Sequence, residues 1–427
     1  MTTGSPYQRR IVDDELDELI ADLAAIAIEG PKGVGKTRTA LRRARTAHRL
    51  DDPVQLAVAR ADPARLLEGE RPILIDEWQR LPEVWDLVRR AVDDGAPPGS
   101  FLLTGSALPD PPPTHSGAGR IVTVRMRPFA LAERLGLASV GLSELLTGAQ
   151  APIVGETKVS LTDYTEELLA SGLPGLRSLS ARGRRRQLDG YITRIVDRDI
   201  SDDAGTVIRN PAALRRWMAA FAAASSTTAS FETIRDAASA GHERKPSKDA
   251  TQAYRDALTR IWVLDEVPAW IPTNNPLHEL GRAPKHQLAD PALAAQLLGV
   301  QASTLLAGHS PGPVIPRAGT LLGALFESLA TLCVHVYAAH SEARVGHLRT
   351  ARGRHEIDLV VERADGGVLA IEVKLARNVS EQDVNHLTWL KQKLGDRVLD
   401  RVLITTGPAA YRRRDGIAVV PLALLGP

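Results

Sequence analysis

A glycine-rich loop near the N-terminus limits the possible folds more than any other part of the sequence. Residues 30–37 read GPKGVGKT and fit the pattern G-x-x-x-x-G-K-[ST], between an apolar run of strand character, AAIAIE, and a helix-forming stretch. Glycines let backbone amides turn toward phosphate oxygens, and the following helix presents its positive end to them. The pattern therefore predicts a nucleotide site made by Gly30, Pro31, Lys32, Gly33, Val34, Gly35, Lys36, Thr37 and Thr39.

The chemistry of phosphate binding gives roles to five side chains. We expect Lys36 to reach the β and γ phosphates of ATP and the Thr37 hydroxyl to ligate Mg²⁺. A second apolar run, ILI, ends in Asp76 and Glu77. Asp76 would hold the ion through water, and Glu77 would polarise the attacking water. Thr104 ends the next apolar run and could sense the γ phosphate, although an ordinary strand-terminal turn would have the same sequence.

Short apolar runs alternate with helical patterns over the first third of the chain. This alternation predicts a parallel sheet covered by helices on both faces. A helix is expected after the phosphate loop, as far as about Leu50. The stretch from Leu108 to Gly119 contains consecutive prolines, so we expect a loop there, beside the nucleotide site. After AAIAIE, the predicted strands are Val54–Ala59, Arg71–Glu77 and Ser100–Ser106.

Several motifs together resemble a known family. GPKGVGKT, LIDEWQRLPE, LLTGSA and a GR pair followed by VRMRPFALAE are similar to the bacterial and archaeal AAA-type ATPases that are joined to a C-terminal domain of unknown function. ASGLPG resembles a later landmark of the same family. The resemblance implies ATP hydrolysis, a homo-oligomer, and Arg120 as an arginine finger that acts across a subunit boundary. A solvated surface arginine is the alternative, because arginine is abundant in this chain.

The rest of the chain divides into two further regions. Residues 156–284 have a helical pattern, and the spacing of the last helices would suit a winged helix, although many small helical subdomains would look the same. Residues 285–427 alternate helices and strands again. The sequence therefore predicts an α/β protein with a P-loop NTPase domain at residues 1–155, a helical lid with a possible winged helix at 156–284, and a nuclease-like α/β domain at 285–427.

The last of these regions contains a hairpin with a concentration of charge. EIDLVVE and VLAIEVK, joined by RADGG, read as two strands. A three-residue loop at Asp365–Gly367 would place Asp358 opposite Lys374 and put Glu372 on the same face. Three ionisable groups would then converge between apolar neighbours. Such a cluster suits Mg²⁺, because that ion prefers oxygen ligands.

The spacing of these charges resembles the D…(D/E)-x-K signature of restriction-endonuclease-like nucleases. In that fold an acidic residue on the preceding helix completes the site, and Glu327 in LLGALFESLA matches it. The resemblance implies a Mg²⁺ site of Glu327, Asp358 and Glu372, with Lys374 as a further catalytic residue. The alternatives are a salt-bridged hairpin or a nuclease-like fold kept as a binding module. Lys374 favours function, because only nine of the 53 basic residues are lysines.

Charge and hydropathy set broad limits on partners and location. The net charge of +2 means that a DNA or RNA partner would need a local basic patch. No run approaches the roughly 18 apolar residues of a membrane span, which predicts a cytoplasmic protein without a membrane partner. The leading hypothesis is an ATPase whose nucleotide state governs assembly or a nuclease-like domain acting on nucleic acid. The alternatives are a nucleotide-dependent DNA-binding or regulatory switch that does not cut, and a partner protein without ATP turnover, which the presence of Glu77 disfavours.

Overall fold

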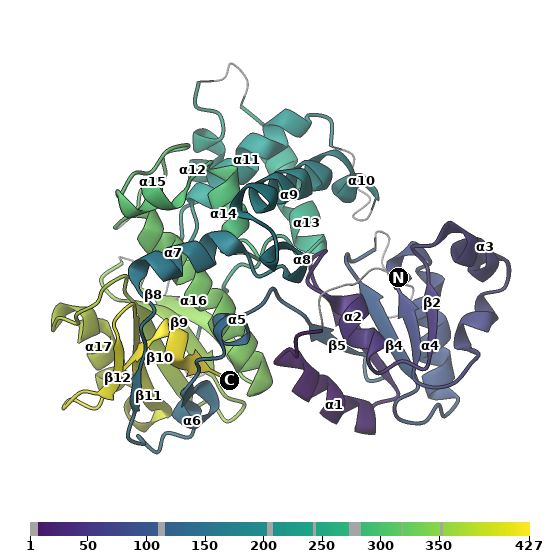
Figure 1. Ribbon diagram of the computed structural model, residues 1–427, viewed down its shortest axis with the longest axis horizontal. Helices are drawn as coiled ribbons and strands as arrows, with labels where there is room; N and C mark the ends of the chain where they lie inside the picture. The colour runs from purple at the N-terminus through teal and green to yellow at the C-terminus, as the bar shows by residue number, and fades with distance from the viewer. Residues whose placement is uncertain are drawn as a thin grey trace.

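The computed structural model describes residues 7–109, 116–202, 208–241, 245–272, 283–317, 319–350 and 353–427. Figure 1 shows an N-terminal α/β group in purple and blue, a helical group in teal and green, and a second α/β group that contains the yellow C-terminal strands. This arrangement confirms the predicted fold class. Residues 110–115 of the predicted proline-rich loop lie outside the described residues.

The N-terminal sheet has five parallel strands in the order β2-β3-β4-β1-β5. Three of them, β1, β3 and β4, are buried along their whole length, as expected for apolar runs covered on both faces. Because parallel strands end at one edge, the residues that follow these three strands come together. The strands are β1 Ala25–Glu29, β2 Thr46–Arg49, β3 Ile73–Asp76, β4 Phe101–Gly105 and β5 Val122–Arg125. The helices of this group are α1 Val12–Asp22, α2 Lys36–Leu41, α3 Pro53–Ala61 and α4 Glu83–Asp93.

Two of the predicted elements in this group are wrong. Residues 54–59, expected as a strand, belong to helix α3, because the side chain of Asp52 caps its N-terminus and Pro53 fits its first turn. The helix that follows the phosphate loop ends at Leu41, well before Leu50. The stretch expected to continue it contains the edge strand β2, which is only partly buried and lacks a strong apolar pattern.

Four elements of the expected ATPase region lie instead with the C-terminal strands: α5 Leu131–Leu135, β6 Val140–Gly141, α6 Leu142–Leu146 and β7 Val154–Glu156. β6 pairs with β14 (Leu425–Gly426), and β7 pairs with β12 (Ala409–Arg412). In Figure 1 this blue segment lies beside the yellow strands. The structure therefore differs from the expected boundary at residue 155. Pairing between strands so far apart in sequence leaves no local pattern that could reveal it.

The helical group extends past its expected end at residue 284. Helices α14 and α15 both contact α7, and α14 also contacts α9 and α11. Helices α11 to α13 are followed by two antiparallel bridges, which join Leu264 to Leu288 and Val267 to Lys285. This order suits the winged-helix alternative. The elements are α7 Leu161–Ala170, α8 Pro174–Arg177, α9 Ala181–Arg194, the π-helix η3 Ile195–Asp199, α10 Ile200–Asp202, α11 Pro211–Ala223, α12 Phe231–Ala237, α13 Lys248–Arg260, α14 Pro291–Leu297 and α15 Ala302–Leu306.

The C-terminal sheet has seven strands in the order β7-β12-β13-β11-β10-β9-β8. One hydrophobic core joins one face of this sheet to the N-terminal sheet and the helical group, and a separate core lies under α17 on the other face. Helix α16 is long and apolar enough to cross a membrane by length and composition, but 78% of its most apolar stretch is buried, as in the core helix of a folded domain. The remaining elements are α16 Leu321–His340, β8 Arg344–Arg349, β9 Glu356–Glu362, β10 Val368–Val373, α17 Asn385–Leu394, β11 Val398–Thr405 and β13 Ala418–Pro421.

The charged hairpin forms, but its predicted register is wrong. Strands β9 and β10 are antiparallel, with Glu362 paired to Val368. In this loop Gly366 has φ of 84°, the left-handed conformation that favours glycine. If this pairing is continued by one residue on each strand, Asp358 lies opposite Glu372 and not opposite Lys374. The two carboxylates still share a face, because the shift is by two residues.

Candidate functional site

The phosphate loop lies at the carboxyl edge of the N-terminal sheet, between β1 and α2. A Cβ at Gly30 would lie 2.1 Å from the carbonyl oxygen of Met126, so no larger residue fits there. Gly35 has φ of 103°, a left-handed conformation that favours glycine. Both motif glycines are therefore required by the path of the backbone, which turns sharply into the first turn of α2.

The Lys36 side chain is buried in this loop. Its ammonium donates hydrogen bonds to the carbonyl oxygens of Gly30, at 2.7 Å, and Pro31, at 3.0 Å. Burial lowers the pKa of Lys36 to about 8, although the carboxylates of Glu77 and Asp76 act in the opposite direction. The groups that touch the ammonium are neutral, so its charge is not cancelled by direct contact. An anionic phosphate is the kind of partner that such an ammonium favours.

Asp76 and Glu77 lie beside the loop, at the end of β3. The Thr37 hydroxyl donates a 2.7 Å hydrogen bond to Asp76 Oδ1, and the Thr104 hydroxyl donates to the same oxygen. These are hard oxygen ligands of the kind that Mg²⁺ requires, so the residues fit that ion. Glu77 has φ of 57°, which is uncommon for a residue with a side chain and typical of functional sites. Its Oε2 accepts a 2.8 Å hydrogen bond from the Ser106 hydroxyl.

A cavity of about 660 Å³ opens beside these residues. Of the residues predicted for the nucleotide site, the lining contains Lys32, Gly33, Val34, Gly35, Lys36, Thr37, Thr39, Asp76 and Glu77. Gly30, Pro31 and Thr104 are not in the lining, but they contact Lys36 or Asp76 as described above. The lining also includes residues outside the predicted set, among them Tyr7, Arg10, Phe129 and Arg177. Tyr7 is held at the site by a 2.9 Å hydrogen bond between its hydroxyl and that of Thr39.

The helical group also contacts the nucleotide site. Arg177, at the end of α8, receives its orientation from Glu167, which accepts hydrogen bonds of 2.7 and 3.0 Å from the guanidinium. Lys32 of the phosphate loop lies 2.7 Å from Asp199 in the π-helix η3. The helical group therefore lines the cavity through Arg177 and contacts the phosphate loop through Asp199. ASGLPG, which shortly precedes Arg177, is the sequence signal that could have found it.

Arg120 lies apart from the cavity and does not line it. Its side chain is about half exposed, and Nε lies 2.7 Å from Asp93 Oδ1 at the end of α4. A residue that serves a neighbouring subunit must lie on the surface and away from its own site, and a solvated ion pair has the same location. The arginine-finger role of Arg120 stays a prediction.

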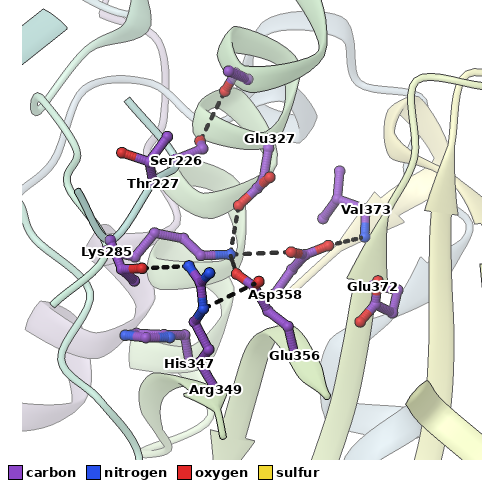
Figure 2. Close-up of polar contacts among 12 residues, drawn as sticks. Ser226, Thr227, Lys285, Glu327, His347, Arg349, Glu356, Asp358, Glu372 and Val373 are labelled. Carbon is purple, nitrogen blue, oxygen red and sulfur yellow. Dashed lines mark hydrogen bonds and ion pairs between the residues drawn. The ribbon is translucent and has the colours of Figure 1, made fainter. Parts of the chain in front are cut away.

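A lysine that the sequence analysis did not assign lies at the centre of the C-terminal acid cluster (Figure 2). Lys285 Nζ lies 2.8 Å from Glu327 Oε1, 3.0 Å from Asp358 Oδ1 and 3.5 Å from Glu356 Oε1. The whole residue is buried. Burial alone would lower the pKa of Lys285, but Asp358 and Glu327 raise it well above its ordinary value. Lys285 therefore carries a positive charge inside this cluster at neutral pH.

The two carboxylates nearest this ammonium differ in their protonation. Burial raises the pKa of Glu327 to about 8, and the neighbouring Asp358 carboxylate adds to that effect. Burial also acts to raise the pKa of Asp358, but Lys285 and Lys374 outweigh it and lower that pKa. Asp358 therefore gives up its proton more readily than Glu327 and is the main anion that balances Lys285.

Glu372 and Lys374 form a second ion pair beside the first. Glu372 Oε2 accepts a 2.9 Å hydrogen bond from Lys374 Nζ, whereas Oε1 is buried without a hydrogen-bond partner. Burial and the Asp358 charge raise the pKa of Glu372 well above its ordinary value. The structure thus brings Asp358, Glu372, Lys374 and Glu327 together, with Lys285 among them.

The metal role of this cluster stays a prediction. Within the described parts of the chain, no three His, Cys, Asp or Glu side chains are arranged to hold a metal ion. The Lys285 ammonium lies between two of the expected ligands, Glu327 and Asp358. The scarcity of lysine, which pointed to Lys374, applies equally to Lys285 and is the signal that could have found it.

Three parts of the chain match known domain families. Residues 23–135 match an AAA domain, residues 161–304 match a domain of unknown function (DUF8612), and residues 322–425 match another (DUF4143). The first match and the strand order identify the N-terminal group as an AAA-type ATPase domain. The matched ranges also place α14 with the helical group, as the packing does.

The chain is also similar to uncharacterized proteins of Mycobacterium bovis and Mycobacterium tuberculosis. Each is 28% identical over 307 residues, which make up 69% of this chain and 60% of the relative. A Walker-type ATPase of Pyrococcus abyssi has a TM-score of 0.40 at 15% identity, over 67% of this chain and 94% of its own. A mutant form of Thermotoga maritima RuvB has a TM-score of 0.24 at 17% identity, over 60% and 87%.

Proposed function

We propose that this chain binds ATP with Mg²⁺ and hydrolyses it at the cavity beside the phosphate loop. The observation that carries the proposal is the convergence of Lys36, Thr37, Asp76 and Glu77 at one edge of a parallel sheet, within an AAA domain. These four side chains supply the cation, the magnesium ligands and the acid that ATP hydrolysis needs.

Each residue has a distinct task in this proposal. Lys36 exchanges its carbonyl partners for phosphate oxygens, and Thr37 and Asp76 hold Mg²⁺, which neutralises phosphate charge when bound. Glu77, oriented by Ser106, polarises the attacking water. Pre-positioned groups of this kind accelerate phosphoryl transfer without covalent chemistry.

The proposal includes a homo-oligomer in the cytoplasm, without a membrane partner. Arg120 would complete the site of a neighbouring subunit, because it lies on the surface and outside its own cavity. Arg177 and Asp199 would report the nucleotide state to the helical group, since one lines the cavity and the other holds Lys32 of the phosphate loop.

A second proposed activity is magnesium-dependent cleavage of DNA or RNA by the C-terminal domain, controlled by the nucleotide state. Asp358 and Glu372 provide hard oxygen ligands, and Oε1 of Glu372, which has no hydrogen-bond partner, fits a cation in chemistry. Lys374 would orient water or stabilise charge on a phosphate. The competing proposal is a nucleotide-dependent switch that binds nucleic acid or a partner and does not cut.

One assay separates these proposals. The full chain is incubated with single- and double-stranded DNA and RNA, with and without ATP and Mg²⁺, beside the variants Lys36→Ala, Glu372→Ala and Glu381→Ala. Glu381 is an exposed acid in the same domain and serves as the matched control. ATP hydrolysis that persists in Lys36→Ala would contradict the ATPase proposal. Cleavage that is lost in Glu372→Ala alone supports a nuclease, and binding without cleavage supports the switch.

A further inference from the structure

The backbone of Lys285 is bonded to a segment that follows helix α13 of the helical group, and two residues further on the same segment pairs with β8 of the C-terminal sheet through Ala269 and His347. The Lys285 backbone exchanges two hydrogen bonds of 2.9 Å with Val267, which follows α13. The side chain then extends from this bridge into the acid cluster of the other domain (Figure 2). Its ammonium can therefore leave the cluster if the bridge moves, while the carboxylates stay on their own strands and helix.

The same bridge is attached to the ATPase domain. The amide of Asp265 donates a 3.0 Å hydrogen bond to the Gln287 carbonyl oxygen. The buried carboxylate of Asp265 binds two arginines, one at the end of β5 and one just after it. Arg125 Nη2 lies 3.1 Å and Arg127 Nε lies 2.7 Å from this carboxylate. The bridges join residues 264–267 to residues 285–288. The first segment carries Asp265, which is held by the ATPase domain, and the second carries Lys285, which is held by the acid cluster.

The residue between these arginines abuts the phosphate loop. The amide of Met126 donates a 2.7 Å hydrogen bond to the Glu29 carbonyl, and its own carbonyl is the group that leaves no room for a Cβ at Gly30. A change in the loop on nucleotide binding would therefore be felt by Arg125 and Arg127. Packed side chains and ion pairs of this kind transmit a change only if the element has two positions.

We propose that Lys285 is a built-in cation that excludes divalent ions from the acid cluster, and that nucleotide binding withdraws it through Asp265 and the bridge. An ammonium between Glu327 and Asp358 competes with a metal ion for the same oxygens. Glu372 Oε1, which is buried without a hydrogen-bond partner and lies 3.9 Å from His386 Nδ1, is the oxygen that remains for the incoming ion. The inference rests on the proposed function and adds its regulation.

The first test measures Mn²⁺ binding to the full chain without nucleotide. Binding is monitored by the decrease in the electron paramagnetic resonance signal of free Mn²⁺. Lys285→Met keeps the length of the side chain and removes its charge, so it is expected to bind one Mn²⁺ at least about tenfold more tightly than wild type. Adding Glu372→Gln abolishes the gain. Lys245→Met, which removes an exposed paired lysine, leaves binding as in wild type. Equal affinity of wild type and a folded Lys285→Met would overturn the exclusion by Lys285.

The second test leaves Lys285 in place and measures its exposure by amine acetylation and mass spectrometry. Without nucleotide Lys285 is protected, whereas the exposed Lys393 is labelled. With ATP bound to Glu77→Gln, labelling of Lys285 is expected to rise about tenfold or more, with Lys393 unchanged. Continued protection at saturating ATP overturns the nucleotide link. If the variant binds no ATP, the proposed function fails instead, and the Mn²⁺ result still decides the exclusion.

Discussion

Two buried lysines, Lys36 and Lys285, serve the two regions of the molecule in opposite ways. Lys36 is 5% exposed and touches only neutral carbonyl oxygens, so burial lowers its pKa to about 8. Lys285 is 0% exposed and touches three carboxylates, which raise its pKa. The first lysine has charge to offer a ligand, whereas the charge of the second is already neutralised within the fold.

The difference shows that burial of a cation does not by itself mark a binding site. A desolvated ammonium without anionic partners is costly to the fold, and this cost is offset when an anion binds. An ammonium inside a carboxylate cluster is stable until one partner is removed. We therefore expect the nucleotide site to accept a ligand as it stands, and the acid cluster to accept a metal ion only after Lys285 leaves.

The largest expected effect tests the first half of this comparison. Lys36→Ala is expected to abolish ATP turnover and to weaken ATP binding beyond detection, because the other lysine of the loop, Lys32, is paired with Asp199 and cannot replace it at the β and γ phosphates. Turnover is measured by phosphate release and binding by calorimetry. Hydrolysis at the wild-type rate would show that the phosphate-loop assignment is wrong.

Glu77→Gln separates binding from chemistry within the nucleotide site. The amide keeps the shape of the side chain but cannot act as a base, so we expect turnover to fall by about 10² to 10⁴ with ATP affinity unchanged. Single-turnover kinetics and calorimetry measure the two quantities. An equal loss of affinity would assign Glu77 a structural role.

Matched methionine substitutions compare the two lysines directly. Lys285→Met leaves buried carboxylates without their cation and is expected to lower the free energy of unfolding by about 3 to 5 kcal/mol. Lys36→Met removes a desolvated charge that has no anionic contact, so we expect a change within about 1 kcal/mol. Urea denaturation of both variants measures the free energy of unfolding. Equal decreases in the two variants would contradict the difference that we infer between the two lysines.

The pH dependence of ATP affinity follows from the lowered pKa of Lys36. Bound phosphates favour the charged ammonium, so ATP binding takes up a proton wherever free Lys36 is neutral. Affinity is therefore expected to be constant below about pH 8 and to fall by up to about tenfold per unit above it. Calorimetry in buffers of different ionisation enthalpy measures the proton. Lys36→Arg, which stays charged, should lack this slope, and a flat wild-type profile to about pH 9.5 would contradict the assignment.

The smallest expected effect concerns whether each region is complete in one chain. The acid cluster has its cation within the same chain, whereas the nucleotide site would borrow Arg120 from a neighbour. We expect ATPase activity per chain to rise several-fold with protein concentration and Arg120→Ala to remove that rise. A constant rate across dilution, from a protein that stays monomeric with ATP, would count against the finger.

Local patterns predicted the parts of the fold that depend on neighbouring residues. The run ILI and the two acids after it predicted β3 and its edge, and the hairpin was expected from apolar alternation and a glycine-containing loop. Prediction failed where a local signal was misread, as at residues 54–59. There the helix-start signal of Asp52 and Pro53 outweighs the strand signal of the apolar run. Prediction also failed at β6 and β7, whose strand partners lie far away in the sequence.

The sequence by itself determined the phosphate loop and the two acids at the end of β3, because their geometry follows from contiguous residues whose backbone requirements are short-range. Only the tertiary structure decided which cation meets the C-terminal acids. Glu327, Asp358 and Lys285 come from a helix, a strand and a bridge of the helical group, and nothing in their spacing indicates a contact. Ion pairs between distant segments are selected when packing excludes water around them, and this exclusion exists only in the folded chain.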